Sequence, residues 1–279
     1  MSESSLNSEA LIRLGLFGLT LLLLAGFELL VPRRKQSIAR RRRWPSNLGL
    51  VLVDTLAMRI IFPTALVGWA LLVEARGWGL LNNVLLPAAA EVGIALVLLD
   101  LVIYGQHVLF HAVPLLWRLH RVHHSDLEFD VTTGVRFHPV EIILSMMIKF
   151  AAVAVLGAAA LAVMLFEIML NTATMFNHSN IALPHSADRL LRLLLVTPDM
   201  HRVHHSILAR ETHSNFGFNL AWWDRIFGTY RAQPEEGHGS MVIGLPIFRD
   251  PSDMRFSRML SQPLRNAAPP IDHGHSTDH

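Results

Sequence analysis

Histidine is the side chain most able to do chemistry in this sequence, and it occurs in clusters. The hexapeptide HRVHHS stands at residues 120–125 and, letter for letter, again at 201–206. Residues three and four apart share a face of a helix, so each copy would project three imidazoles together. His107 and His111 have the same four-residue spacing. Because neutral imidazole is the commonest metal ligand in proteins, these clusters predict a metal site.

The number of clustered histidines indicates two metal ions. Eight imidazoles exceed the ligand count of one tetrahedral site, so each HRVHHS copy is expected to supply one side of a two-metal centre. His138 and His178 are isolated, but the expected topology brings both to the same membrane face. The predicted ligands are His107, His111, His120, His123, His124, His138, His178, His201, His204 and His205. Zinc, copper, iron and nickel all accept such ligands.

Three acidic residues could orient these ligands. A ligand histidine usually donates its free ring N–H to a carboxylate or a carbonyl group. Glu141, Asp199 and Asp224 are the candidates for this role. No catalytic residue is predicted beyond the metal ligands.

The composition predicts an all-α, multi-span membrane protein. Hydrophobic residues make up 52% of the chain and charged residues only 16%, against roughly 25% in soluble domains. Cysteine is absent, which excludes disulfides and thiolate metal sites. The formal net charge of +2 gives no reason to expect a nucleic-acid partner.

The apolar segments define the expected topology. Residues 11–31, 48–73 and 88–105 each approach the length of about 20 residues that crosses a bilayer. Residues 142–176 are too long for one upright span and predict a helical hairpin that turns near 156–160. Residues 190–196 (LLRLLLV) predict a helix at the membrane interface. In the spans, Arg59 is expected to pair with Asp54 or Asp100.

Seven basic residues between Arg33 and Arg43 set the expected orientation. By the positive-inside rule they lie in the cytoplasm, which places every histidine cluster on the cytoplasmic side of a bacterial-type inner membrane. The expected regions are an N-terminal span with a basic linker (1–46), transmembrane helices (47–106), a di-metal region (107–232) and a cytoplasmic tail (233–279). A cytoplasmic helical cap would hold the dinuclear histidine site.

The clusters resemble those of the fatty acid hydroxylase/sterol desaturase superfamily, which comprises integral-membrane di-iron oxygenases. The family pattern H-x(3,4)-H, H-x(2,3)-H-H, H-x-x-H-H is matched in order by the three clusters, and NFGFNLAWWDRIFGTY (215–230) adds to a resemblance that covers roughly residues 95–232. The resemblance implies two iron ions, O2 and a lipid or sterol-like substrate that is hydroxylated or desaturated. It also implies a separate electron donor, such as a ferredoxin or a cytochrome/reductase.

One departure from the family and one alternative function stay open. The fatty acid 2-hydroxylase branch has a further histidine where this chain has Thr174, and His138 is expected to replace it. Zinc binds imidazole more tightly than Fe(II), so purified protein can acquire zinc. A zinc-dependent membrane hydrolase with Glu141 or Asp199 as general base is therefore the alternative.

Overall fold

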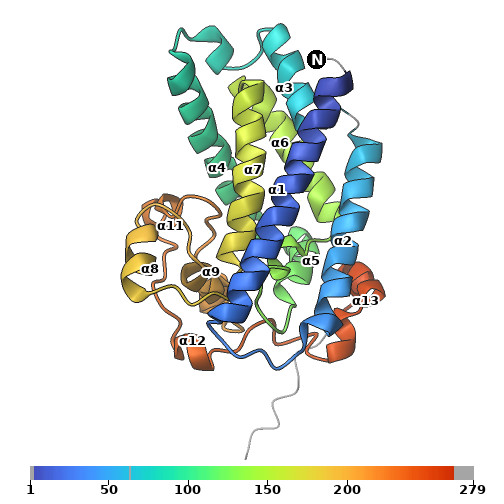
Figure 1. Ribbon diagram of the computed structural model, residues 1–279, viewed down its shortest axis with the longest axis vertical. Coiled ribbons are helices and arrows are strands. Elements are labelled where there is room, and N and C mark those ends of the chain that lie inside the picture. The colour runs from blue at the N-terminus through green and yellow to red at the C-terminus, as the bar shows by residue number, and fades with distance from the viewer. Residues whose placement is uncertain (1–2, 63, 267–279) are drawn as a thin grey trace, which may run out of the picture.

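The computed structural model describes residues 3–62 and 64–266, and its regular elements in those ranges are all helical. Long helices form an upright bundle, and short helices gather at its lower end (Figure 1). The longer helices are α1 (Glu3–Leu30), α2 (Arg40–Ile61), α3 (Ala65–Ala75), α4 (Ala88–Ala112), α5 (Pro114–His124), α6 (Pro139–Leu156) and α7 (Ala160–Asn177). The all-α prediction is confirmed.

Five segments of the described chain are long and apolar enough to cross a membrane. They are Leu11–Leu30, Arg40–Ala75, Ala88–Ala112, Pro139–Leu156 and Ala160–Asn177. The second comprises two helices, because α2 ends at Ile61 and α3 begins at Ala65. The predicted hairpin is present, and Gly157, with φ of +69°, ends its first helix. The multi-span prediction is confirmed.

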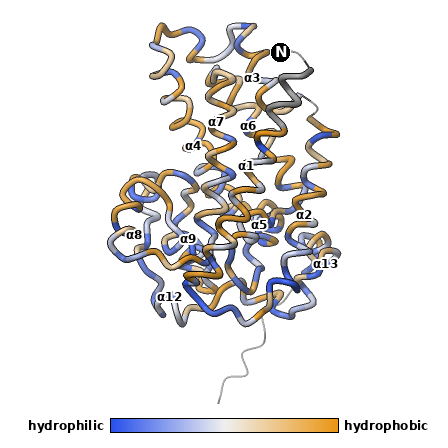
Figure 2. Tube along the Cα trace, in the orientation of Figure 1, coloured by the Kyte–Doolittle hydropathy of each residue, from blue (hydrophilic) through white to orange (hydrophobic). Residues whose placement is uncertain are grey.

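The bundle core lies among α3, α4, α6 and α7. Leu66, Leu99, Val153 and Phe166 are among its fully buried side chains. Figure 2 shows that hydrophobic residues predominate along the long helices, and many of them are exposed, among them Leu19, Leu52 and Ile60. Because lipid tails are as apolar as these side chains, close packing rather than exclusion of water holds such helices together.

The upper turns of the bundle pack backbone against backbone. A Cβ atom on Gly79 would lie 2.1 Å from the backbone nitrogen of Gly157, and φ at Gly79 is +89°. The Leu80 N–H donates to the Val155 carbonyl at 3.0 Å. Glycine is therefore required where the α3–α4 connection meets the α6–α7 turn.

Short helices form the predicted cap at the lower end of the bundle (Figure 1). They are α8 (His185–Leu191), α9 (Pro198–His204), α10 (Ala209–Thr212), α11 (Trp222–Ile226), α12 (Gly237–Ser240) and α13 (Phe256–Ser261), with the 3₁₀ helix η4 (Gln262–Leu264). The helix expected at 190–196 lies earlier in the chain, at His185–Leu191. It ends at Leu191, and Leu195 forms a bridge with Leu220.

The region predicted as a tail is folded as far as the structure describes it. Helix α13 packs on α2, and η4 packs on α5. Arg121 Nη2 donates to the carbonyl groups of Gln262 and Arg265, both at 2.7 Å. Residues 267–279, including His273, His275 and His279, lie outside the described residues.

Asp100 connects a span to the cap. This carboxylate, one of the two expected partners of Arg59, instead accepts hydrogen bonds from Asn219 Nδ2 at 2.7 Å and Trp223 Nε1 at 2.8 Å. The Leu220 N–H donates to its second oxygen at 3.1 Å. A buried carboxylate needs such donors, so Asp100 fixes the 219–223 segment against α4.

Candidate metal centre

Nine of the ten predicted ligands gather into two groups. In each group, one ligand atom per residue lies within 4.8 Å of all the others, and every side chain is buried. The five-histidine group comprises His107, His111, His120, His124 and His204. The four-histidine group comprises His123, His178, His201 and His205.

Both HRVHH copies contribute to both groups, which corrects the expectation of one copy per side. His120 and His124 join the five-histidine group, but His123 joins the other. In the second copy, His201 and His205 join the four-histidine group and His204 crosses over. The residue at i+3 is rotated about 60° from i in one direction, while i+4 is rotated by about 40° in the other. This difference divides each triplet in the same way.

Helices α4, α5 and α9 present most of the ligands. His107 and His111 lie on the last turns of α4, so a candidate span extends directly into the site. The two triplets lie at the ends of α5 and α9, and His178 is the C-cap residue of α7. Proline at the first helical position starts both α5 and α9, which fixes where each triplet falls on its helix.

Oxygen acceptors fix the ring orientation of three ligands in the five-histidine group. Each accepts from an Nδ1–H, which leaves Nε2 as a bare lone pair in the neutral ring. The acceptors are the Phe216 carbonyl for His107 at 2.7 Å, the Glu141 carboxylate for His120 at 2.6 Å and the Ser214 carbonyl for His204 at 2.6 Å.

These lone pairs point at one another. His107 Nε2 lies 3.1 Å from His120 Nε2 and 3.0 Å from His204 Nε2. With the ring protons held at Nδ1, no proton remains to lie between them. Buried acceptors that face each other without a donor are costly, so the arrangement fits a bound cation.

In the four-histidine group, the proton position is fixed for one ring, His178. His178 Nδ1 donates to the Thr174 carbonyl at 2.7 Å, so its Nε2 is a lone pair. That Nε2 lies 3.0 Å from His123 Nε2 and 3.1 Å from the Nε2 atoms of both His201 and His205. Four imidazole nitrogens thus converge in a second buried group that fits a cation.

The closest nitrogens are near enough for neighbouring rings to bind one cation. Two ligands about 2.1 Å from a metal lie about 3.0–3.4 Å apart, depending on the angle between them. The closest Nε2 pairs are 3.0–3.1 Å apart in both groups. Each group therefore fits a cation bound by several imidazoles.

Burial keeps the ligand rings neutral. It lowers the pKa of His120 to about 3, and it does the same for the pKa of His178. Burial, followed by the neighbouring histidines, puts the pKa of His205 well below the usual value near 6.5. Neutral imidazole is the form that binds a metal, so the site is ready for one at pH 7.

The three carboxylates predicted to orient ligands differ in how they contact the ligand histidines. Glu141 contacts a ligand directly through His120. Asp224 acts one step away, because it accepts from the backbone N–H of Phe216 at 2.7 Å, and the carbonyl of Phe216 holds His107. Asp199 forms ion pairs with Arg33 and Arg202, and no hydrogen bond to a ligand involves it among the described residues.

His138 is the predicted ligand that the structure brings to neither group. It is the N-cap of α6, where its Nδ1 accepts from the Val140 N–H at 3.2 Å. Its Nε2 lies 3.1 Å from the Leu260 carbonyl. Both nitrogens are thus occupied by backbone groups, so His138 does not compensate for Thr174.

Sequence reasoning missed the carbonyl acceptors and one carboxylate, Glu28. Glu28 Oε1 accepts from the backbone N–H groups of Val131 and Asn180, both at 2.7 Å, and Oε2 pairs with Arg40. Asn180 lies two residues after His178, and Val131 belongs to the loop that follows the first triplet. Glu28 therefore connects α1 to both loops beside the four-histidine group. An isolated Glu near the end of an apolar segment was the only sequence signal.

Further contacts from residues 31–47 reinforce this connection. The Arg33 N–H donates to the Asn180 carbonyl, and the Ala182 N–H donates to the Val31 carbonyl, both at 2.8 Å. Arg43 and Asp130 form a fully buried ion pair. The segment between α1 and α2 thereby holds the His178 loop in place, and the first turns of α2 hold the 126–135 loop.

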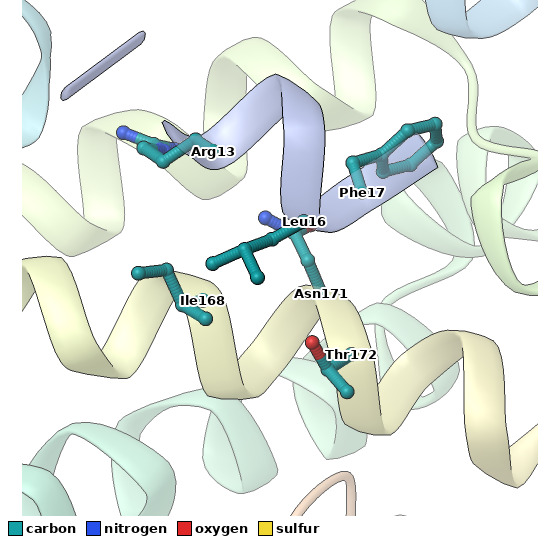
Figure 3. Close-up of a pocket in the computed structure, with 6 residues that line it drawn as sticks. All are labelled: Arg13, Leu16, Phe17, Ile168, Asn171 and Thr172. Atoms are coloured by element: carbon teal, nitrogen blue, oxygen red, sulfur yellow. The ribbon is translucent and has the colours of Figure 1, made fainter. Parts of the chain in front are cut away.

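Two pockets lie outside the histidine groups. Figure 3 shows the smaller, between α1 and α7, lined by Arg13, Leu16, Phe17, Ile168, Asn171 and Thr172. Its volume of about 10 Å³ is too small for a lipid chain. The larger, of about 530 Å³, is lined partly by Arg33, Asp188 and Asp199. Its charges suit a polar group rather than a hydrocarbon chain.

Residues 92–229 match the family model described as fatty acid hydroxylase. The matched segment begins in α4 and includes every histidine of both groups. The chain belongs to the fatty acid hydroxylase/sterol desaturase superfamily. The match does not include α1 or α2, so Glu28 and Arg43 brace the domain from outside it.

Three relatives are named for their activities on lipids. Ornithine lipid hydroxylase OlsE of Rhizobium tropici is 30% identical over 148 residues, 53% of this chain and 44% of its own. Human alkylglycerol monooxygenase is 27% identical over 163 residues, 57% and 34% of the two chains. Rat cholesterol 25-hydroxylase is 29% identical over 192 residues, 67% and 61%. The chain thus spans less than half of the first two relatives. No solved structure gives a significant match.

The two groups predict how metal content responds to substitution. Unmodified protein should bind two metal ions per chain, measured by elemental analysis after purification. His205→Ala should lose about one of them, because the four-histidine group keeps only three donors. His138→Ala should retain both, since it removes a histidine outside the groups. Equal loss of metal from His138→Ala and His205→Ala would contradict this assignment.

Glu28 can be tested with a pair of substitutions. Glu28→Ala leaves two buried backbone N–H groups unpaired, at a cost on the order of 1–3 kcal/mol each. Glu28→Gln keeps an oxygen for both and loses only the ion pair with Arg40. We expect Glu28→Ala to lower the thermal midpoint in detergent and the metal content more than Glu28→Gln does. Identical behaviour of the two variants would show that the backbone bonds do not matter.

Proposed function

We propose that the chain is a membrane-bound oxygenase that hydroxylates a C–H bond of a lipid, with one iron ion held by each histidine group. The observation that carries this proposal is the convergence of nine buried histidine side chains in two adjacent groups. A single four-coordinate ion would leave five of the nine without a metal. Membership of the superfamily supports iron as the metal.

Iron bound by these groups would supply the activation of O2 and the attack on an unactivated C–H bond. The protein contributes nine neutral imidazoles and the acceptors that orient them. Phe137 stacks on His123 with ring centroids 4.5 Å apart, and Trp117 packs against His111 at 4.8 Å. These aromatic rings restrict access of water to the ligands.

Hydroxylation is the preferred outcome over desaturation. The printed names of the relatives are hydroxylases and monooxygenases that act on an ornithine lipid, an alkylglycerol and cholesterol. These names support a lipid or sterol-like substrate, with desaturation as the second outcome of the same site. Hydroxylation also consumes two electrons. The proposal therefore includes a separate electron donor, such as a ferredoxin or a cytochrome/reductase.

A zinc hydrolase is less well supported. It would need a general base beside the metal, and Asp199 is instead paired with Arg33 and Arg202. Glu141 accepts from His120, which suits an orienting role.

The reaction can be tested with labelled oxygen. Iron-loaded protein in lipid nanodiscs, supplied with electrons, 18O2 and a membrane lipid extract, should form a product one 18O atom heavier, measured by mass spectrometry. His205→Ala should form none of it, and zinc-loaded protein should be inactive. If the zinc form is active and the new oxygen comes only from water, the hydrolase takes the place of the oxygenase.

We also propose that both groups lie on the cytoplasmic side of a bacterial-type inner membrane. The basic residues between Arg33 and Arg43 support this orientation, because they lie at the same end of the bundle as the histidines. A reporter fused after Ser240 should then behave as cytoplasmic. One inserted at the fully exposed Leu85, in the α3–α4 connection, should behave as external. Reversed signals would invert the topology.

A further inference from the structure

Helices α8 and α11 form a lobe beside the bundle that exposes large apolar side chains. In a soluble environment, a contiguous exposed patch of this kind usually marks an interaction surface. We call these residues the lobe patch: Leu190, Leu193, Leu194, Trp222, Ile226 and Phe227, with exposed fractions from 41% to 68%. Six large apolar side chains exposed together call for an occupant.

Backbone hydrogen bonds join the two halves of the lobe patch. The Ala221 N–H donates to the Leu194 carbonyl at 2.9 Å. Trp222 Nε1 donates to the Leu193 carbonyl at 3.0 Å. With its only polar atom bonded in this way, the indole of Trp222 presents an apolar ring. The six side chains therefore belong to one fixed surface and not to two separate loops.

The lobe patch adjoins a candidate span. Phe227 stacks on the buried Tyr104 of α4 with ring centroids 5.3 Å apart and an interplanar angle of 18°. Half-buried Leu101 and Val108 of α4 pack in the same cluster as Tyr104. Figure 1 places α11 beside the lower part of α4, and Figure 2 shows hydrophobic residues along this side of the lobe. The lobe patch is therefore joined to α4 by apolar contacts.

Charged residues border the lobe patch in the way expected at a membrane interface. Arg189 and Arg225 are exposed beside it, and the Arg225 guanidinium lies 4.3 Å from the centre of the Tyr230 ring. Helices that lie in the headgroup region combine leucine and tryptophan on one face with basic residues at its border. A bilayer therefore fits this composition and the position of the lobe patch beside α4.

We propose that the lobe patch lies in the headgroup–acyl boundary of the bilayer that α4 crosses. The occupant is the lipid itself, in the leaflet at the histidine end of the spans. Helix α9 begins seven residues after α8 ends and carries His201 and His204. The lobe thereby anchors the segment that supplies these ligands to the membrane surface. This inference is independent of the reaction catalysed.

The absence of cysteine makes a direct test possible. Leu193→Cys and Ile226→Cys would each carry one environment-sensitive fluorophore on the full chain in phosphatidylcholine nanodiscs. Ser240→Cys, on exposed α12 at the far end of the cap, is the control. Retention of both metal ions would show that each labelled variant is folded.

We expect lipids brominated on their upper acyl carbons to quench the labels at 193 and 226 at least threefold more than the label at 240. Aqueous iodide should show the reverse order. If labels 193 and 226 respond to iodide as strongly as label 240, the lobe patch faces water and the proposal fails. If neither quencher reaches them, protein covers the surface, such as a second copy of the chain, and the proposal is equally overturned.

Discussion

The feature on which the rest of the structure depends is the meeting of histidine lone pairs in a dry interior. His107, His120 and His204 have their ring protons held at Nδ1 by oxygen acceptors, so their Nε2 atoms face each other at 3.0–3.1 Å with no proton between them. Such an arrangement is unfavourable without a cation. Each acceptor must be rigid, and the acceptors are carbonyl groups of two chain segments, at Thr174 and at 214–216, together with the Glu141 carboxylate.

Part of this rigidity comes from outside the superfamily domain. The α1–α2 connection pairs with the strand-like segment after His178, and Glu28 joins two loops through backbone N–H groups. On the other side, Asp100 holds the 219–223 segment against α4. Buried charges within or near a membrane are costly, and Glu28 and Asp100 are matched by donors that belong to the loops of the site. These two carboxylates therefore serve to position the cap.

The long helices and the clustering of the histidines could be predicted from the sequence because both rest on local periodicity. Apolar length predicted the long helices and the hairpin, and histidine spacing predicted which residues share a helical face. His138 shows the limit of such reasoning. Topology brings a residue to one end of a bundle, whereas a metal ligand must place its donor atom about 2 Å from the metal. The carbonyl acceptors could not be predicted either, since every residue has a carbonyl. Glu28 gave no local pattern because its partners are more than a hundred residues away.

Each short helix that carries an HRVHH triplet sends ligands to both groups, and this has a mechanical consequence. A turn of α5 about its axis that displaces His123 must displace His120 and His124 as well, and the same holds for α9. A rotation of either helix therefore moves ligands of both groups. A lipid that displaces either helix would move ligands of both groups at once. The ligand geometry of one group therefore cannot change while that of the other stays fixed. For the same reason, a mutation that shifts one triplet to alter the ligand positions in one group would also alter them in the other.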